Sequence, residues 1–240
     1  MHCELVVPGL FAAAGAQARL PALELLLARG RLKDGEPQSL EEWLAGAFGL
    51  DDGPLPAGAL SLLALGRDPG GRSWSRADPV HLRVLRDRLA LVPAGAFEIT
   101  AGESAALCDA LSRHFAPLEF VPVDAGRWCA SLDEGTPALL NEAQMLLHAH
   151  PVNEAREARG EPAVNSLRLW GGGPAPAVPP CRWQSVSAGD PLVLGLARAA
   201  EARHLPLPAA AGEWLERAPE EGRHLVVLDA LRLPLALGGA

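Results

Sequence analysis

The chain has 240 residues, a net charge of -8 and 49% hydrophobic residues, so it can bury a substantial core and is too apolar to be disordered. Lys33 is the only lysine and no basic stripe is present, which argues against a nucleic-acid-binding protein. The N-terminus has no basic region typical of a signal peptide, and no apolar run is long enough to span a membrane. The four cysteines are widely spaced and form no CxxC pair, which indicates reduced thiols and a cytoplasmic protein.

The first part of the chain predicts one strand and three helices. Residues 3–7 (CELVV) form a short apolar run ended by Pro8-Gly9, which indicates a buried strand. Apolar residues at helical spacing follow over 20–27, 39–48 and 59–65. Ser39, with Glu42 three residues later, has the pattern of a capping box at a helix start. The loop GRDPGGRS at 66–73 predicts a boundary.

From Trp74 the periodicity changes to that of strands. The segments HLRVL, RDRLALV, LEFVPV and RWCASL are predicted strands, and GESAALCDALSRHF between the second and third is a predicted helix. This β-β-α-β-β pattern predicts an inserted α+β subdomain over residues 71–135.

After Thr136 a long helix (PALLNEAQMLLHAH) leads back to the rest of the fold. The strand SLRLW, the strand RWQSV, the helix PLVLGLARAAEAR and the strand HLVVL follow in that order. This alternation predicts an α/β core of three layers with a mostly parallel sheet, formed by residues 1–70 and 136–240. Ligands of such sheets bind beyond the carboxyl ends of the strands, where we expect Pro8-Gly9, Gly171 to Gly173, Ser187 to Asp190, and Asp229.

Several polar residues are candidates for ligand binding. Asn153 and Arg156 lie three apart on a short predicted helix and project from one face, either toward a ligand or as a helix cap and an ion pair. Asp190 precedes Pro191 at a predicted helix start, either as a cap alone or beside N–H groups that hold an anion. The triple glycine after Trp170 either admits a ligand to the backbone or is a simple exit from the strand.

The remaining candidates are weaker. Arg86 and Arg88 form either a phosphate clamp on one strand or a solvated hairpin edge. His148 and His150 are two residues apart near a helix end, which is a poor spacing for metal ligands. The sequence contains no P-loop, GxSxG, HExxH or dinucleotide-binding fingerprint, so no catalytic residue, metal or cofactor is predicted.

The order of six segments carries a family resemblance. CELVVPGL, LPALELLLARG, LPAGALSLLALGRDP, VLRDRLALVPAGAFEITAGESAAL, HPVNEAREARGEPAVNSLRLWGGG and SVSAGDPLVLGLARAAEAR together resemble the archaeal-type cofactor-independent phosphoglycerate mutases of the alkaline phosphatase superfamily. The stretches NEAQMLLHAHPVNEAREARG and RADPVHLR are similar to a bacterial group of RpfE-type regulatory, phosphoglycerate-mutase-like proteins. The resemblance covers most of the chain and implies an alkaline-phosphatase-like core with an inserted subdomain.

The resemblance also implies that the two-metal site of the mutases is lost. Their first strand ends in Asp-Gly, whose Asp is a metal ligand, whereas this chain has Pro8-Gly9. Their nucleophilic Ser and the adjoining ligand Asp align with Ala57 and Gly58, and their Arg in the glycine-rich turn aligns with Trp170. Asp229 is the one candidate ligand left after the last strand, too few for two-metal phosphoryl transfer.

Three functions follow from these alternatives. The favoured one is a non-catalytic regulatory or metabolite-binding protein for a small phosphorylated or carboxylated metabolite, with Asn153, Arg156, Asn165 and Trp170 lining its pocket. The others are an active mutase or phosphatase with a rearranged site, and a structural partner of another protein with a vestigial pocket. In a vestigial pocket, Asn153, Arg156 and Asn165 fix the connection between helix and strand.

Overall fold

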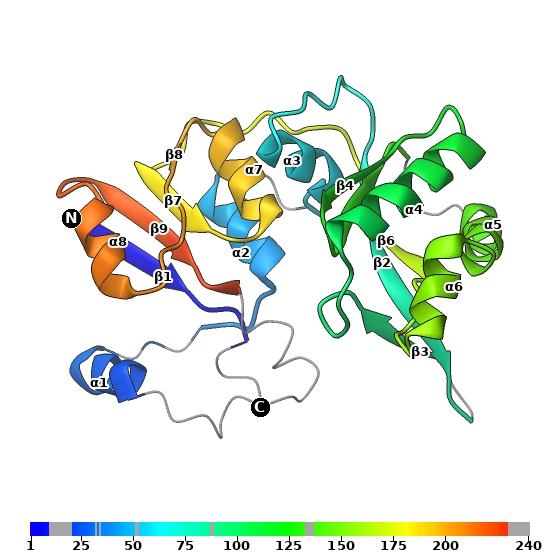
Figure 1. The fold of residues 1–240 in the computed structure, drawn as a ribbon. Helices are drawn as coiled ribbons and strands as arrows, with labels where there is room; N and C mark the ends of the chain where they lie inside the picture. Colours follow the sequence, from blue (N-terminus) through cyan, green and yellow to red (C-terminus); the bar gives the residue numbers. More distant parts are fainter. Residues whose placement is uncertain are drawn as a thin grey trace.

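A computed structural model describes residues 1–9, 21–31, 33, 35–50, 53–86, 89–132 and 137–229 of the chain. The described residues form two β-sheets side by side, one parallel and one antiparallel, each with its own helices (Figure 1). Among these residues, no helix combines the length and the apolar character needed to cross a membrane.

The parallel sheet joins the two ends of the sequence. Its strand order is β1-β9-β7-β8, and every neighbouring pair is parallel. The bounds are His2–Val6 for β1, Ser185–Ala188 for β7, Arg203–His204 for β8 and Arg223–Val227 for β9. The carboxyl ends of β1, β7 and β9 therefore meet at one edge of the sheet, as predicted for three of the four segments.

Helices cover both faces of the parallel sheet. Helices α2 (Leu40–Ala47), α3 (Ala57–Ala64) and α7 (Pro191–Ala199) bury a core on one face that includes Leu44, Leu60, Val186, Leu192 and Leu225. Helix α8 (Ala211–Arg217) lies on the other face, where the Trp214 indole donates to Ser187 Oγ at 2.9 Å. The fold class predicted from the sequence, an α/β core with a parallel sheet, is confirmed. Helix α1 spans Pro21–Arg29.

Two helix starts form as the sequence predicts, because their signals are local. Ser39 Oγ accepts from the Glu42 amide at 3.1 Å and Glu42 Oε2 accepts from the Ser39 amide at 2.6 Å, so the capping box of α2 is complete. Asp190 accepts from the Leu192 amide at 2.8 Å and caps α7, with Pro191 in its first turn.

The antiparallel sheet has the order β3-β2-β5-β4, with β6 paired to β2 as well. Its strands are β2 (Ser75–Val84), β3 (Leu89–Pro93), β4 (Phe120–Asp124), β5 (Arg127–Ala130) and β6 (Ser166–Trp170). Helices α4 (Ala101–His114), α5 (Pro137–His148) and α6 (Pro151–Ala158) lie on one face of this sheet (Figure 1). They bury a second core that includes Leu107, Leu111, Trp128, Leu147 and Val164.

Strand β6 corrects one expectation from the sequence. The segment SLRLW was expected in the parallel sheet, but it pairs antiparallel with β2, with Trp170 opposite Arg76 and Ser166 opposite Val80. Its alternation explains this: Leu167 is buried in the second core, while Arg168 faces outward. The antiparallel sheet thus draws on residues beyond 71–135, and the division into two domains stays a prediction.

The other face of the antiparallel sheet meets helix α3 at one end. Leu62 of α3 packs there with Trp74 and Cys129 in a third apolar cluster. Burial raises the pKa of the Cys129 thiol to about 12. None of the four cysteines is in a disulfide. This contact fixes the position of the two sheets relative to each other and leaves a cleft beside it.

Candidate functional site

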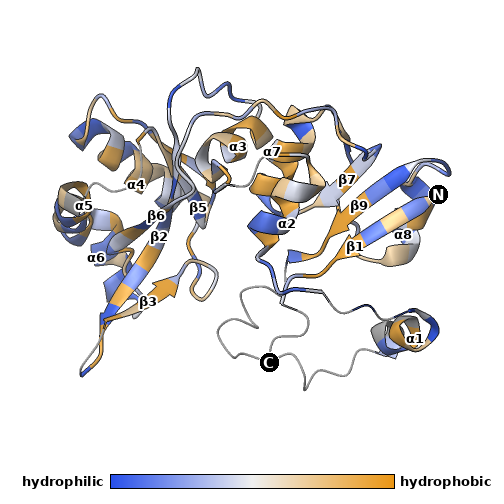
Figure 2. Ribbon diagram, turned by 180° about the vertical axis from the view of Figure 1, so that it is seen from behind, coloured by the Kyte–Doolittle hydropathy of each residue, from blue (hydrophilic) through white to orange (hydrophobic). Residues whose placement is uncertain are grey.

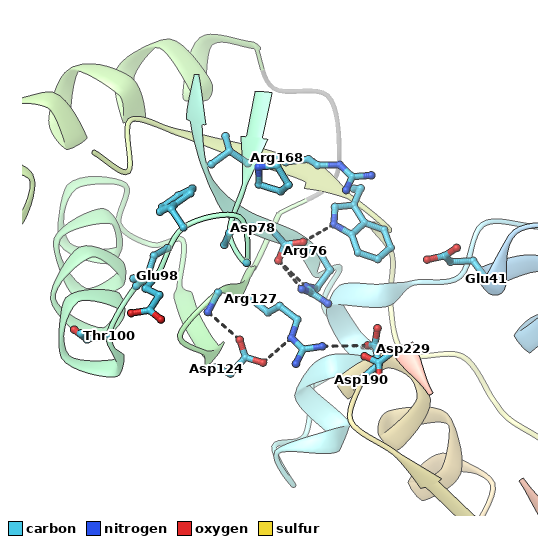
Figure 3. Close-up of a pocket in the computed structure, with 18 residues that line it drawn as sticks. Glu41, Arg76, Asp78, Glu98, Thr100, Asp124, Arg127, Arg168, Asp190 and Asp229 are labelled. Carbon is cyan, nitrogen blue, oxygen red and sulfur yellow. Dashed lines mark hydrogen bonds and ion pairs between the residues drawn. The ribbon is translucent and has the colours of Figure 1, made fainter. Parts of the chain in front are cut away.

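A cleft of about 910 Å³ lies between the antiparallel sheet and the carboxyl edge of the parallel sheet (Figure 3). Its size is in the range of small-molecule sites. The charged lining residues are three arginines and six acids: Arg76, Arg127, Arg168, Glu41, Asp78, Glu98, Asp124, Asp190 and Asp229. Apolar and aromatic side chains, including Val80, Pro93, Phe97 and Trp170, complete the wall.

The floor of the cleft is a buried network centred on Asp78. Arg76 is 2% exposed and donates to Asp78 Oδ1 through Nε at 3.0 Å and through Nη2 at 2.5 Å. The Trp170 indole donates to Asp78 Oδ2 at 2.8 Å. Burial lowers the pKa of Arg76, but the charge of Asp78, its hydrogen bonds and other nearby negative groups together outweigh this, so the pKa is raised and the guanidinium stays charged. Both charges are thereby compensated within the protein.

Arg127 connects the two sides of the cleft. It lies at the start of β5, and its Nε binds Asp124 at 2.5 Å. Its Nη1 is 3.9 Å from Asp190, which belongs to the loop between β7 and α7 of the parallel sheet (Figure 3). Because Asp190 also caps α7, the positive end of that helix is already occupied by a carboxylate of the protein. The cap alone accounts for Asp190, and no separate anion site at this helix start is needed.

Arg168 differs from the other two arginines. It is exposed on β6, and its guanidinium carbon lies 5.5 Å from the centre of the Trp170 ring. Arg76 lies 5.3 Å from the same ring. Within the described part of the chain, Arg168 has no carboxylate within ion-pair distance, so its donors can bind a ligand. Planar guanidinium groups suit carboxylate and phosphate, which they bind through two parallel hydrogen bonds.

Among the residues predicted to line a pocket, Trp170 lies in the wall of the cleft, whereas Asn153 and Asn165 lie outside it. The Asn153 side chain is 1% exposed and bonds to backbone groups of Leu147 and Val164, at 2.7 Å to 2.8 Å. The side-chain amide of Asn165 accepts from the Leu82 N–H at 2.7 Å and donates to the Leu82 C=O at 3.0 Å. These two bonds continue the hydrogen bonding between β6 and β2 beyond the start of β6. Asn153 and Asn165 were expected either to line a ligand pocket or to fix the connection between helix and strand. These contacts support the second alternative.

Arg156 is also a structural residue. It is 1% exposed and donates to the carbonyls of Pro162 and Glu98, at 2.8 Å and 2.7 Å, and to Glu103 Oε2 at 2.9 Å. Burial raises the pKa of Glu103, but its bonds from Thr100 and the charge of Arg156 outweigh this and leave the pKa lowered. Every nitrogen of Arg156 has a protein acceptor, so it supports the Glu98 wall of the cleft without reaching a ligand.

The structure describes one of the two arginines predicted to form a phosphate clamp. Arg86 is exposed in the turn after β2, and it is not a lining residue. Arg88 lies outside the described residues.

The positions that the resemblance aligns with the nucleophile and its neighbouring ligand are enclosed by backbone. Ala57 is fully buried at the start of α3. A β-carbon at Gly58 would overlap the Trp74 carbonyl and lie 2.5 Å from the carbonyl carbon of Ser75. A β-carbon at Gly171, which has a φ of +61°, would lie 2.5 Å from Ala57 Cβ. The triple glycine therefore serves close approach of two backbone segments.

Most of the cleft residues were not identified from the sequence, among them Arg76, Asp78, Arg127 and Arg168. A partial signal was present, because Arg76 and Asp78 occupy alternate positions of a strand and so share a face. Arg168 likewise shares one face of β6 with Ser166 and Trp170, because the three occupy alternate positions of the strand. Within the described ranges, no three His, Cys, Asp or Glu side chains are grouped in a way that could hold one metal ion.

Comparison with known proteins gives similarity at the level of structure. The chain is similar to the PH0037 protein from Pyrococcus horikoshii, with a TM-score of 0.58 and 19% identity over 98% of this chain and 74% of that one. A cofactor-independent phosphoglycerate mutase from Thermoplasma acidophilum gives a TM-score of 0.44 and 19% identity over 84% and 70% of the two chains. No protein-family model and no curated protein sequence matches. The chain thus shares the overall α/β fold of PH0037.

Proposed function

We propose that the protein is a non-catalytic, phosphoglycerate-mutase-like protein that binds a small anionic metabolite in the cleft between its two sheets. The proposal rests on the cleft geometry and on the resemblance of the sequence to the mutases and to the RpfE-type regulatory group. Binding without turnover is what a metabolite-responsive regulatory protein requires.

The closure around Ala57 and Gly58 is the observation that carries the non-catalytic assignment. A nucleophile there needs a side chain directed into the cleft, next to the metal-binding groups it works with. Gly58 cannot acquire even a β-carbon without displacing the backbone of Trp74, and Ala57 is packed against Gly171. Both positions therefore lie in the contact between α3 and the neighbouring backbone segments, which leaves no space for a nucleophilic side chain.

The charges of the cleft favour a ligand with one anionic group. Arg76 and Arg127 are each bound by an aspartate of the protein, which leaves Arg168, among the described residues of the lining, as the arginine available for a ligand. The other lining acids would repel a second anionic group. A carboxylate or a phosphate monoester therefore fits better than a bisphosphate.

Arg168→Ala tests the proposal, with Arg83→Ala as the matched control. Arg83 is an exposed arginine of the same sheet that does not line the cleft. Calorimetric titration with small carboxylates and phosphate monoesters should show binding that Arg168→Ala weakens by roughly 1.5 to 3 kcal/mol, the range for hydrogen bonds to a charged group. Arg83→Ala should bind like the native chain. Equal binding by both variants would contradict the cleft assignment, and manganese-dependent mutase or phosphatase turnover that a chelator abolishes would contradict the non-catalytic one.

A further inference from the structure

The open face of the antiparallel sheet continues beyond the cleft as a row of apolar side chains. Residues two apart on a strand share a face, and directly opposite residues of an antiparallel pair share it too. Val80 and Pro93 are opposite each other and both line the cleft. The next pairs outward on that face are Leu82 with Leu91 and Val84 with Leu89. We call these six residues the apolar strip.

The apolar strip becomes more exposed with distance from the cleft. Val80 is 1% exposed, whereas Leu91, Leu89 and Val84 are 46%, 67% and 80% exposed. The intervening residue Val92 points to the opposite face, into the core under the helices. Figure 2 shows β3 as a hydrophobic strand at the end of the sheet. Single exposed apolar residues are ordinary on protein surfaces, but a continuous row that begins in a ligand-sized cleft marks a binding surface.

We propose that the ligand of the cleft is an amphiphile, with one anionic head group at Arg168 and an unbranched alkyl or acyl chain along the apolar strip. This inference rests on the proposed function and specifies its substrate class. The proposed ligand is a free single-chain molecule in solution and not part of a lipid bilayer.

The register of the sheet brings the head and tail sites together. Arg168 is opposite Asp78 on β2, and Val80 is the next residue of β2 on the same face. A head group bound by Arg168 therefore has the start of the strip beside it. From Val80 to Val84 the strip extends for roughly 13 Å, at about 3.3 Å per strand residue. This length suits an extended chain of medium size.

The binding chemistry is also complementary at the two ends. Arg168 supplies one cation, and the excess of acids in the cleft disfavours any further anionic group on the ligand. The strip carries no charged or hydrogen-bonding side chain, so a tail gains affinity there only by removing apolar surface from water. The combination of one charge and a long apolar surface defines an amphiphile.

The test is calorimetric titration of the whole protein with butanoate, hexanoate, octanoate and decanoate below their micelle concentrations. For the native protein we expect the affinity to rise by about twofold for each methylene group added to the ligand. Full burial of a methylene group raises affinity about fourfold, and the strip covers only one side of the alkyl chain. The double variant Leu89→Gln/Leu91→Gln should bind butanoate as the native chain does and lose most of the dependence on chain length. Met145→Gln, which changes a 75% exposed side chain on α5, is the matched control and should behave as native.

The outcomes separate this inference from the proposed function. Butanoate binding that depends on Arg168, with no gain for decanoate, would overturn the amphiphile and leave the cleft function intact. Failure of every short carboxylate and phosphate monoester to bind would overturn the proposed function itself, and the head-group site with it. Sedimentation showing a native dimer that the double variant disrupts would assign the strip to self-association, and binding to lipid vesicles lost in that variant would assign it to a membrane. Either result contradicts the inference.

Discussion

Replacing Arg156 by alanine should destabilise the fold by about 4 kcal/mol. The change leaves the carbonyls of Pro162 and Glu98 without the donor of two partly buried hydrogen bonds, and an acceptor left unpaired costs about 1 to 3 kcal/mol. Glu103 keeps its bonds from Thr100 and Arg159, so its charge remains compensated.

Urea unfolding measures this effect directly. With a slope of about 3 kcal/mol per molar urea, the midpoint of Arg156→Ala should fall by more than about 1 M. Arg159→Ala is the matched control, since Arg159 also binds Glu103 and Glu161 but its side chain is 49% exposed and water replaces its bonds. A midpoint for Arg156→Ala as high as that of Arg159→Ala would refute the structural role and restore Arg156 as a candidate for ligand binding.

Three further predictions concern stability. Thermal melts of Gly58→Ala should show a loss of about 3 kcal/mol from overpacking, whereas Gly46→Ala, where a β-carbon meets no atom within 4 Å, should gain up to about 1 kcal/mol. Asp78→Asn leaves the charge of Arg76 buried and uncompensated, so the melting temperature should fall by about 10 °C; an unchanged one would exclude the pair as a structural anchor. The lowered pKa of Glu103 stabilises the fold above the unfolded value of about 4.3, and this contribution disappears as pH falls through the folded pKa. Urea midpoints of Glu103→Gln should thus decline less than native between about pH 6 and pH 3; parallel declines would show that Glu103 does not contribute.

Local signals predicted most of the elements of this fold. The capping box at Ser39 and the Asp190-Pro191 helix start lie within a few residues of sequence, and both form. The placement of β6 was wrong because the order of strands and helices does not reveal which strands pair. Its alternation, with Leu167 buried and Arg168 exposed, was the better indicator of a sheet with one open face. Strand β8 has two residues and no apolar run, so no pattern in the sequence marks it.

The cleft was less predictable than the fold because its contacts are between distant segments. The bond between the Trp170 indole and Asp78 depends on the register of β6 against β2, which no local pattern specifies. The two alternatives for Arg156 could not be separated from the sequence for a related reason. Its acceptors at Glu98 and Glu103 come from a loop and a helix far from α6 in sequence, so a buried arginine and a ligand-binding one have the same local pattern.

The pairing of β1 with β9 constrains how the protein folds during synthesis. The antiparallel sheet lies within residues 75–170 and can form as soon as that segment has left the ribosome. The parallel sheet cannot form until Arg223 emerges and pairs with His2, and contacts between such distant residues are slow to form. During that interval β1 has unpaired backbone groups and an apolar Leu5, a combination that attracts other strands. Strand β1 of the nascent chain is therefore prone to aggregation during this interval, and a chaperone that binds this strand would raise the yield of native protein.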